Sequence, residues 1–474
     1  MSKNFEKKKG EENVKNKKLL FLLLLGLMLI IAACSSDDDG EEEKDNENTE
    51  EEKVEEDTEE PESTEDSGDG TISGKLEIQY FVGGYGDSWW KEVIADFKEA
   101  YPDVEVIEHA GPNINEEMRS RWVQDNPPDV VYIDGAGSSE TQMVEDGQLM
   151  DLTEFLETVE LEDGSLLKDN FIVDPANYDG KIYSIPLVFD TWGTWYDKAL
   201  FEDKGYDVPT DFESFMSSME EIQGNEDIAP FVTTGQYPYY FLRGVLYPAF
   251  GAAGGDQLLT DVIQGKEGAW SSPEVLEVMK KVEEMQKAGF IDDGFAALNH
   301  TQSQMNFLLH QNAYIPVGFW LPNEMAADVP DGFDFGFIPS PMNDAGEPYA
   351  IVPDLRPLAI AEKAANPEAA KAFVDFVFTR EFAAAFSEHT GAIMNVGGVD
   401  LSSNPNVPGY LIEANELIND PNTVQIYQKP HPMSADLETP ISNALVSLML
   451  GNMSAEEFVE EAEQAAAEYR SGLE

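Results

Sequence analysis

The sequence predicts an α/β fold, and three observations support this prediction. Between residues 75 and 133, three apolar, strand-like segments alternate with two segments whose apolar residues recur at helical spacing. A strand–helix–strand–helix–strand order is typical of an α/β lobe. The chain has 474 residues, of which 42% are hydrophobic and 11% aromatic, so a sizeable core is available. This length is sufficient for two domains or for one large two-lobed domain.

The predicted elements of the first lobe follow one another directly. A strand is expected at residues 75–82, where apolar and polar side chains alternate before a glycine-rich turn. A helix is expected over 89–101, because its apolar residues repeat every three or four positions and a proline follows. A second strand (104–107), a second helix (116–122) and a third strand (129–133) come next. The third strand is short and apolar enough to be central in a parallel sheet.

Helices are expected to dominate the next part of the chain, to about residue 350. Residues 178–183 first predict a hairpin with an Asp-Gly turn. A helix over 212–222 follows two good N-cap residues, and a helix over 275–288 is introduced by Ser-Ser-Pro and ends before a glycine. The other predicted elements are helices at 305–311, 367–378, 443–450 and 455–469 and a strand at 313–317.

The N-terminal region has the layout of a secretory leader. Lysines precede an apolar run at residues 19–33. A transmembrane anchor is the alternative, but the run is shorter than the roughly 20 residues that a helix needs to cross a bilayer. Cys34, the only cysteine of the chain, follows Ile-Ala-Ala in a pattern that resembles a bacterial lipobox. We therefore expect residues 1–33 to be a lipoprotein signal peptide and Cys34 to be acylated, for example with palmitate.

Acidic residues dominate the composition. Residues 34–70 are nearly all Asp, Glu, Ser, Thr and Asn, so we expect a disordered acidic tether that holds the body away from the membrane. The formal net charge is −64, and most of it lies on residues 71–474. Such a surface disfavours nucleic acids and acidic polymers as ligands. We interpret it as a means of staying hydrated in salty or alkaline surroundings.

Five motifs occur in the order in which a known protein family has them. Residues 126–132 resemble its Pro-Asp-Val-Val strand, residues 178–186 its Asp-Gly-Lys hairpin, and residues 195–201 its tyrosine–aspartate–lysine segment. Residues 318–325 are similar to its Gly-x-Trp loop, and residues 366–373 to the helix after its second crossover. Together with the lipobox, these motifs resemble the bacterial extracellular solute-binding proteins of sugar-importing ABC transporters.

The resemblance implies a periplasmic-binding-protein-like fold. Two α/β lobes would be joined by a hinge of two or three crossovers, with the ligand in the cleft between them. Lobe 1 would combine residues 71–185 with 356–425, and lobe 2 would combine 186–355 with 426–474. Such lobes close on the ligand by hinge motion, and the permease would recognise the closed form.

The resemblance also implies a function. A monomeric lipoprotein would capture a carbohydrate, either an oligosaccharide or an amino sugar, and deliver it to the permease subunits of an ABC importer. The pattern over residues 320–325 is most similar to members that take N-acetylglucosamine or chito-oligosaccharides. We expect no enzymatic activity, no cofactor, no metal and no nucleic-acid partner. The lipid anchor would place the protein on the outer face of the cell membrane, and the long tether favours a single-membrane bacterium.

Candidate ligand-binding residues are chosen for their chemistry and position. A neutral sugar presents hydroxyl groups and flat C–H faces, so its site needs carboxylates and amides beside aromatic rings. Such residues follow the predicted strands or lie in the expected crossovers and loops. The candidates are Tyr85, Asp87, Trp90, Asp134, Asp190, Trp192, Tyr237, Tyr239, Tyr240, Trp320, Glu324 and Arg356. Trp320 is preferred, because the resemblance and its local Gly-Phe-Trp context agree.

Several candidates have a structural alternative. Trp90 could lie on the core face of its helix, and Asp87 could cap that helix. Asp134 could cap a loop. Arg356 could brace the hinge, for example against Asp354. Which of the three tyrosines at 237–240 faces the cleft stays open.

Two other functions stay open from the sequence. A surface lipoprotein enzyme acting on glycans needs two carboxylates at a set separation, and so acidic a chain offers too many pairs to choose from. No Gly-x-Ser-x-Gly or His-Glu-x-x-His motif occurs. A binding protein for a peptide or another small solute would need a different balance of cleft residues. The five histidines lack compact ligand spacing, and residues 328–334 suggest calcium without the EF-hand pattern.

Overall fold

The computed structural model describes residues 72–421, 423–426 and 433–473. These residues belong to the unit Asp69–Glu474. The predicted signal peptide (1–33), the acylated Cys34 and the acidic tether (34–70) lie outside the described residues. They therefore stay predictions.

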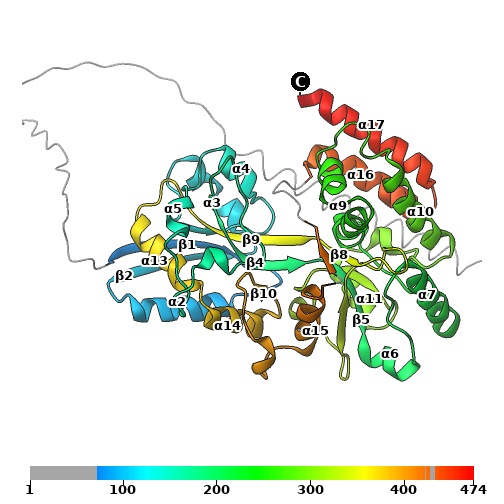
Figure 1. Cartoon of the computed structure of the whole chain (residues 1–474), viewed down its shortest axis with the longest axis horizontal. Helices are drawn as coiled ribbons and strands as arrows, with labels where there is room; N and C mark the ends of the chain where they lie inside the picture. The colour runs from blue at the N-terminus through cyan, green and yellow to red at the C-terminus, as the bar shows by residue number, and fades with distance from the viewer. Residues whose placement is uncertain (1–71, 422, 427–432, 474) are drawn as a thin grey trace, which may run out of the picture. The chain divides into compact units, whose positions relative to one another are not determined.

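The alternating strands and helices of the first lobe are present as expected. They are β1 (Gly74–Phe81), α2 (Ser88–Ala100), β2 (Val104–Gly111), α3 (Ile114–Val123) and β3 (Val130–Tyr132). β1 pairs in parallel with β2 on one side and with β3 on the other. The apolar stripe of α2 is buried against the sheet. In Figure 1, α2 lies below this sheet and α3 above it.

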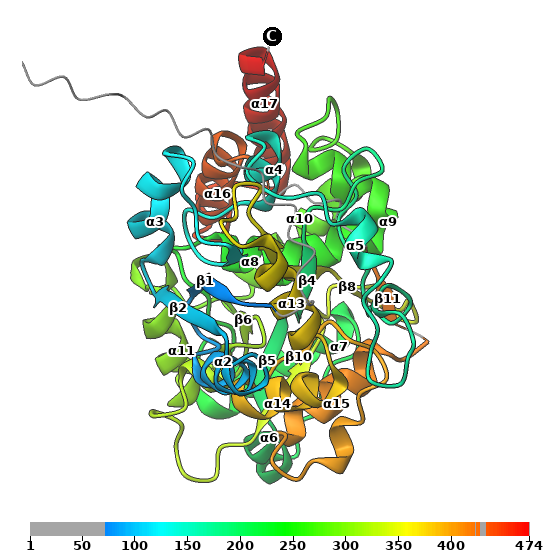
Figure 2. The same cartoon turned by 90° about the vertical axis from the view of Figure 1, so that its left-hand side faces the viewer.

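Three strands from later in the chain complete this sheet. They are β4 (Ile185–Thr191), β9 (Pro353–Ile360) and β10 (Ile393–Met394), and the strand order is β10-β4-β9-β3-β1-β2. β3 is central, as predicted, but its neighbour β9 runs antiparallel to it, so the sheet is mixed. α13 (Pro367–Val377) packs on β1 and β9, and α14 (Arg380–Thr390) packs on α2, as Figure 2 shows.

A second sheet and core follow β4. β5 (Gly193–Asp197) lies between β6 (Ile315–Val317) and β7 (Phe335–Ile338) in an antiparallel sheet. Trp195 in β5 is fully buried, and its Nε1 donates a hydrogen bond to the carbonyl of Val317 at 2.9 Å. Trp195 is therefore a core residue. A further two-stranded sheet pairs β8 (Tyr349–Ile351) with β11 (Thr423–Gln425) in parallel.

Helices account for most of the remaining described chain. They are α4 (Glu140–Glu145), α5 (Thr153–Leu156), α6 (Lys198–Lys204), α7 (Phe212–Glu226), α8 (Tyr239–Phe241), α9 (Tyr247–Ile263), α10 (Pro273–Lys287), α11 (His300–Leu308), α12 (Leu321–Glu324), α15 (Gly409–Ile418), α16 (Ala435–Met449) and α17 (Ala455–Leu473). α16 and α17 pack on each other and on α10. A π-helical turn, Leu242–Leu246, joins α8 to α9. Within the described part of the chain, no helix combines the length and the apolar character needed to span a bilayer.

Most helices expected from the sequence are confirmed, and the helix caps explain where two of them begin. Asp211 accepts a hydrogen bond from the backbone N–H of Ser214 at 2.8 Å, which starts α7. Ser454 and Glu457 exchange backbone–side-chain hydrogen bonds that start α17. The predicted hairpin at 178–183 is reduced to a single antiparallel bridge. The expectation that helices dominate to residue 350 missed four strands there, namely β4, β5, β7 and β8, whereas β6 lies within the predicted strand 313–317.

The chain leaves the six-stranded sheet after β4 and returns to it at β9. β4 leads into β5 through Trp192, and β8 leads into β9 through Val352. Because β4 and β9 are antiparallel neighbours, these two passages lie side by side, with Asp190 opposite Asp354. Residues that are more than 160 positions apart, such as Trp192 and Asp354, are therefore neighbours at the ends of β4 and β9. The proposed lobe boundaries and the hinge motion stay predictions.

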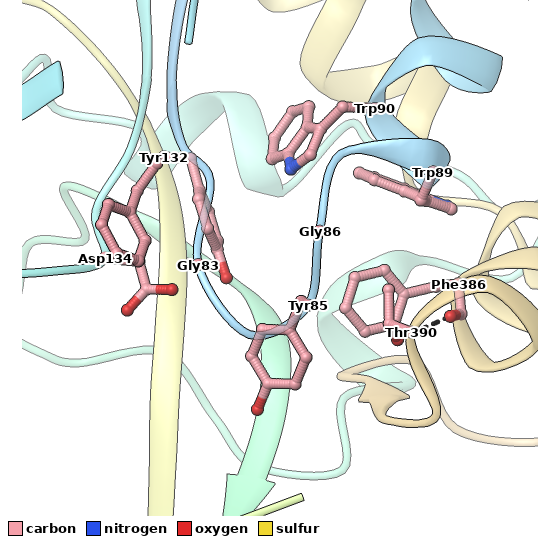
Figure 3. A pocket seen from close by; sticks show the side chains of 10 residues that line it. Gly83, Tyr85, Gly86, Trp89, Trp90, Tyr132, Asp134, Phe386 and Thr390 are labelled. Carbon is pink, nitrogen blue, oxygen red and sulfur yellow. Dashed lines mark hydrogen bonds between the residues drawn. The ribbon is translucent and has the colours of Figure 1, made fainter. Parts of the chain in front are cut away.

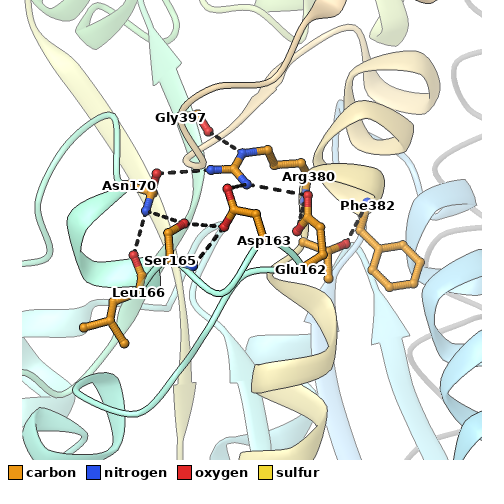
Figure 4. A network of polar contacts seen from close by, with 9 residues as sticks. Glu162, Asp163, Ser165, Leu166, Asn170, Arg380, Phe382 and Gly397 are labelled. Atoms are coloured by element: carbon orange, nitrogen blue, oxygen red, sulfur yellow. Dashed lines mark hydrogen bonds and ion pairs between the residues drawn. The ribbon is translucent and has the colours of Figure 1, made fainter.

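Arg380 fixes the start of α14. Its guanidinium forms an ion pair with Asp163 at 2.9 Å and donates to the side-chain oxygen of Asn170 at 3.1 Å and to the carbonyl of Gly397 at 3.2 Å (Figure 4). Asp163 also accepts from the backbone N–H of Ser165 at 2.9 Å. This network ties the first turn of α14 to a distant loop, and α14 in turn contributes to the site described next.

Candidate ligand-binding site

A small pocket lies where β1 and β3 end (Figure 3). The loop after β1 carries Tyr85, and the turn after β3 carries Asp134, so two predicted residues reach it from neighbouring strand ends. α14 closes the opposite side with Phe386 and Thr390. The lining residues are Phe81, Gly83, Tyr85, Gly86, Trp89, Trp90, Tyr132, Asp134, Phe386 and Thr390.

The start of α2 places Trp90 and Asp87 differently. Trp90 is 4% exposed and stacks on Tyr80, with the ring centroids 4.7 Å apart and the planes 13° from parallel. It is thus packed in the core while one side lines the pocket. Asp87 occupies the N-cap position of α2 without a side-chain capping bond, and it forms an ion pair with Lys91 at 2.6 Å. The ligand roles of both residues stay predictions.

Arg356 in β9 is the centre of a cluster of charged side chains. Its Nε lies 2.9 Å from Oδ1 of Asp134, and its Nη1 lies 2.8 Å from Oδ1 of Asp354. Its Nη2 lies 3.6 Å from Oδ2 of Asp190. Asp190 and Asp354 are opposite each other in the β4–β9 ladder, where two like charges repel. A single guanidinium therefore pairs with three carboxylates. One of these pairs, Arg356 with Asp354, was expected from the alternative in which Arg356 braces the hinge.

The three carboxylates have different proton affinities. Burial raises the pKa of Asp190 to about 7, although the Arg356 guanidinium opposes the shift. Burial likewise raises the pKa of Asp134 above its ordinary value. Burial also acts on Asp354, but there the charges of Arg356 and Arg243 outweigh it, and the pKa is lowered. Asp190 is thus the carboxyl of the cluster that is least well compensated.

Two buried oxygen atoms beside this cluster accept or donate no hydrogen bond within the described part of the chain. They are Oδ2 of Asp190 and the hydroxyl oxygen of Tyr85. The pKa of Tyr85 is raised, first by burial and second by the negative charge of Asp190. An unpartnered buried polar group costs about 1–3 kcal/mol. A polar group of a ligand would remove that cost.

Aromatic rings form a second cluster next to the charged one. Trp192 is 4% exposed, and its ring lies edge-on to Trp320, with centroids 4.6 Å apart, and to Tyr240, with centroids 5.1 Å apart. Trp192 also donates a hydrogen bond from Nε1 to Oδ2 of Asp354 at 2.9 Å. The two clusters are therefore directly connected through Trp192.

The ring cluster extends to the surface along α8. Tyr239 lies 5.1 Å from Tyr240, and Tyr237 lies 6.1 Å from Tyr239, measured between ring centroids. Tyr237 is 39% exposed, whereas Tyr240 is 6% exposed. The rings thus run from the buried Trp192 to an exposed end at Tyr237. Rings of this kind offer flat apolar faces on which a sugar can lie.

Glu324 lies near Tyr240 and contacts two side chains from α11. Its carboxylate accepts a hydrogen bond from the side-chain amide of Gln304 at 2.9 Å and lies 3.5 Å from Nε2 of His300. The His300 ring stacks with Tyr240 at a centroid distance of 6.2 Å and meets Tyr237 at 5.4 Å. Neither Gln304 nor His300 was expected from the sequence, because α11 brings them here from a separate part of the chain.

Two loops meet over these clusters. Asn323 in α12 donates a hydrogen bond from its side-chain amide to the carbonyl of Gly84, in the loop that carries Tyr85. A Cβ atom at Gly84 would lie 2.8 Å from Cβ of Trp320. Position 84 must therefore be glycine for the loop after β1 to approach the tryptophan so closely.

Several further residues near the two clusters were not among the candidates chosen from the sequence. Tyr132 is the last residue of β3, and its position just before Asp134 was a usable signal. Arg243 lies in the π-helical turn, 4.9 Å above the Tyr239 ring and 3.7 Å from Glu438. Neither that turn nor the arrival of Phe386 beside Tyr85 has a local sequence signal. Of the predicted residues, Asp87 pairs with Lys91, and Trp90 packs on Tyr80, Trp89 and Tyr132, so both interact outside the two clusters.

Metal binding is not supported by the arrangement of side chains in residues 72–421, 423–426 and 433–473. Among them, no group of three or more His, Cys, Asp and Glu side chains is placed to hold a metal ion. The chemistry available at the site is hydrogen bonding, charge and ring stacking.

Comparison with known proteins gives one family and several relatives. The family model described as "Bacterial extracellular solute-binding protein" matches residues 83–384. The diacetylchitobiose binding protein NgcE of Streptomyces coelicolor is 25% identical over 323 residues, which are 66% of this chain and 68% of that protein. The multiple sugar-binding protein of Streptococcus mutans is 22% identical over 340 residues, or 69% of this chain and 76% of that protein.

Solved structures with a similar fold include a chitin oligosaccharide binding protein, with a TM-score of 0.67 and 17% identity over 84% of this chain and 100% of that one. Another is the GacH receptor of Streptomyces glaucescens, with a TM-score of 0.64 and 18% identity over 84% of this chain and 98% of that one. At these identities, the likeness establishes a common two-lobed α/β fold.

Proposed function

The chain belongs to the bacterial extracellular solute-binding proteins, and we propose that it captures a carbohydrate and delivers it to the permease of an ABC importer. The carbohydrate is an oligosaccharide or an amino sugar. It binds beside the two chain passages next to β4 and β9, and no covalent bond is made or broken. The proposed lobes, 71–185 with 356–425 and 186–355 with 426–474, close around it.

The observation that carries this proposal is the contact between a ring cluster and a carboxylate cluster through Trp192. Carbohydrates present apolar C–H faces and many hydroxyl groups on the same molecule, so they need both kinds of surface within a few ångströms. Trp320, Tyr239 and Tyr240 supply ring faces beside Trp192. The names of the two curated relatives, which refer to diacetylchitobiose and to multiple sugars, also support a carbohydrate.

Individual roles follow from the positions. Trp320 and Trp192 stack on the sugar, and Tyr237 extends the stacking surface outward for a longer ligand. Asp134, Asp190 and Glu324 accept hydrogen bonds from hydroxyl groups. Tyr85, Trp90 and Asp87 border the site from the loop after β1 and the start of α2. Arg356 both orients the carboxylates and donates to the ligand.

The location of the protein is part of the proposal. Cys34 carries the lipid anchor on the outer face of the cell membrane, and residues 34–70 form the tether to the body. The protein acts there as a monomer, without a cofactor, and its partners are the permease subunits. A single-membrane bacterium is the expected host cell.

A thermal-shift panel of mono- and oligosaccharides, amino acids and short peptides tests the function. A ligand that binds only the folded state raises the melting temperature by mass action. We expect one carbohydrate class to give a clear shift and to be recovered chemically unchanged, as mass spectrometry would show. A carbohydrate that emerges shortened would favour the glycan-active enzyme, and a shift with amino acids or peptides alone would favour a non-carbohydrate solute.

A further inference from the structure

We propose that the carbohydrate recognised by this site carries a protonated amine, and that Asp190, Asp134 and Asp354 bind this amine. The inference rests on the proposed function and narrows its ligand class to sugars with a free amino group. Three independent features of the site support it: the balance of charge, the unpartnered oxygens and the position of the rings.

The charge balance around Arg356 favours a cation. Three carboxylates contact this guanidinium at 2.8, 2.9 and 3.6 Å. The second nearby guanidinium, Arg243, influences Asp354 but is shared with Glu438 at 3.7 Å. Carboxylates therefore outnumber the cations that neutralise them. A neutral ligand leaves this excess in place, whereas an ammonium group compensates it.

Asp190 is the carboxylate of the cluster with the weakest contacts, because Arg356 reaches its Oδ2 only at 3.6 Å. Its side chain is fully buried, Oδ1 accepts from the backbone N–H of Phe319 at 3.1 Å, and Oδ2 accepts no hydrogen bond from any described residue. The closer contacts of Arg356 go to Asp134 and Asp354. An ammonium group has three donors and no acceptor. It could serve Oδ2 of Asp190 and the oxygen of the Tyr85 hydroxyl together.

The proton affinity of Asp190 agrees with this assignment. Burial beside Asp354 raises the pKa of Asp190 to about 7, with Arg356 and Phe319 N–H acting in the opposite direction. Asp134, Tyr85 and Tyr132 are the other titratable groups around it. A cation placed next to the carboxylate lowers its pKa. Binding of an amine near neutral pH should therefore release a proton from the site.

The position of the aromatic rings beside the carboxylates indicates that the amine belongs to a sugar. The indole N–H of Trp192 ends on Asp354, and the indole ring itself touches Trp320 and Tyr240. A pyranose on these rings thus has its substituents within reach of the carboxylates. A small aliphatic amine could use the carboxylates but not the ring faces, so it should bind much more weakly.

The test compares three β-1,4-linked disaccharides that differ only at the C2 positions: glucosamine, N-acetylglucosamine and glucose dimers. Titration calorimetry of the purified full-length protein at about pH 7, where most of such an amine is protonated, gives the three affinities. We expect the glucosamine dimer to bind at least about tenfold more tightly than the other two, as a charge-assisted hydrogen bond allows. Putrescine provides the amine without the sugar and should bind at least about tenfold more weakly than the glucosamine dimer.

Two variants separate local recognition from the overall acidity. Asp190→Asn keeps the size of the side chain and the acceptor for Phe319, and it should reduce the glucosamine-to-glucose affinity ratio towards one. Asp344→Asn removes one carboxylate of the same kind from an exposed side chain that pairs with Lys281, and it should leave the ratio unchanged. Thermal unfolding of each variant shows whether it is folded before titration.

The outcomes distinguish this inference from the function on which it rests. A ratio that falls in Asp190→Asn but not in Asp344→Asn, together with proton release in buffers of different ionisation enthalpy, supports the inference. Equal or tighter binding of a neutral carbohydrate, or putrescine binding as tightly as the glucosamine dimer, overturns it. If no carbohydrate binds at all, the proposed function itself fails.

Discussion

Trp320 is the side chain on which the stacking surface depends most. It contacts Trp192 at 4.6 Å and Tyr240 at 6.3 Å between ring centroids, and it also touches Gly84 of the opposing loop. Trp320→Ala should weaken carbohydrate binding at least about tenfold in titration calorimetry, because a large stacking face is lost. Unchanged affinity would contradict the assignment.

A second tryptophan provides the control for that substitution. Trp122 lies in α3, where its indole N–H donates to Gln79 at 2.9 Å, and it packs on the small core group of Val131, Ile133, Leu149 and Ala359 rather than on the rings of the site. Trp122→Ala removes the same side chain away from the site. The Trp122→Ala variant should keep its affinity for the carbohydrate within about twofold of the wild type, even where its free energy of unfolding is lower.

Asp190 should make the stability of the protein depend on pH. Burial raises the pKa of its carboxyl to about 7 in the folded state, against about 4 for an unperturbed aspartate. Between these values, the folded protein holds a proton that the unfolded chain has released. The stability from this proton is complete below about pH 4 and is lost as the pH rises through about 7.

Asp190→Asn removes this titration. We would measure the free energy of unfolding of both proteins in urea at about pH 5 and about pH 8. The difference between variant and wild type should shift in favour of the variant by a few kcal/mol from the lower to the higher pH. The neighbouring Asp134 and Asp354 are present in both proteins, and Arg356 and Tyr85 keep their protons over this pH range in both, so their effects largely cancel in the comparison. Parallel pH profiles would show that Asp190 has an ordinary pKa.

Single residues of the site were predictable where local chemistry sufficed. Tyr85 and Asp134 were proposed because they follow strands, and Trp320 because the family resemblance agreed with its local Gly-Phe-Trp context. The pairing of Asp190 with Asp354 depends on the β4–β9 register, which a single sequence does not contain. His300, Gln304 and Arg243 come from α11 and the π-helical turn, and no local pattern connects them with the rings.

Arg380 allows a prediction about a whole element, α14. Its guanidinium bonds to Asp163, Asn170 and Gly397 and is 21% exposed. Arg380→Ala should lower the free energy of unfolding by about 2 kcal/mol, because the half-buried acceptors of Asn170 and Gly397 lose a charged donor. Chemical denaturation measures the change.

Arg380→Lys is the matched variant, because it keeps the charge but not the planar fork that reaches three partners. It should recover only part of the lost stability. Full recovery would show that the charge of Arg380 is sufficient, and an unchanged Arg380→Ala variant would show that the network does not hold α14.

Elements were predictable where periodicity was long enough to read. Helices such as α2, α10 and α17 have apolar stripes over three or more turns, and the N-caps of α10 and α17, Ser272 and Ser454, are visible in the sequence. β5 and β7 were missed because all their residues are buried, so the alternation that marks a half-exposed strand is absent. β8 and β11 have three residues each, too few for any period.

The acidity of the whole chain has a consequence for stability. It has 93 acidic and 29 basic residues, with a formal net charge of −64. Charges of one sign repel each other in the folded state, and salt screens that repulsion over about 10 Å at 0.1 M. The melting temperature should therefore rise by about 5 °C or more when sodium chloride is raised from about 0.02 to 0.5 M. A constant or falling melting temperature would indicate that the surface charges are already compensated.

Native mass spectrometry of the purified protein mixed with the carbohydrate panel tests the central claim most directly. It reports the number of protein chains, the number of bound ligands and the mass of the ligand in one measurement. The account predicts a monomer that carries one intact carbohydrate. A protein that binds amino acids or peptides but no carbohydrate, or one that returns the carbohydrate cleaved, would contradict it.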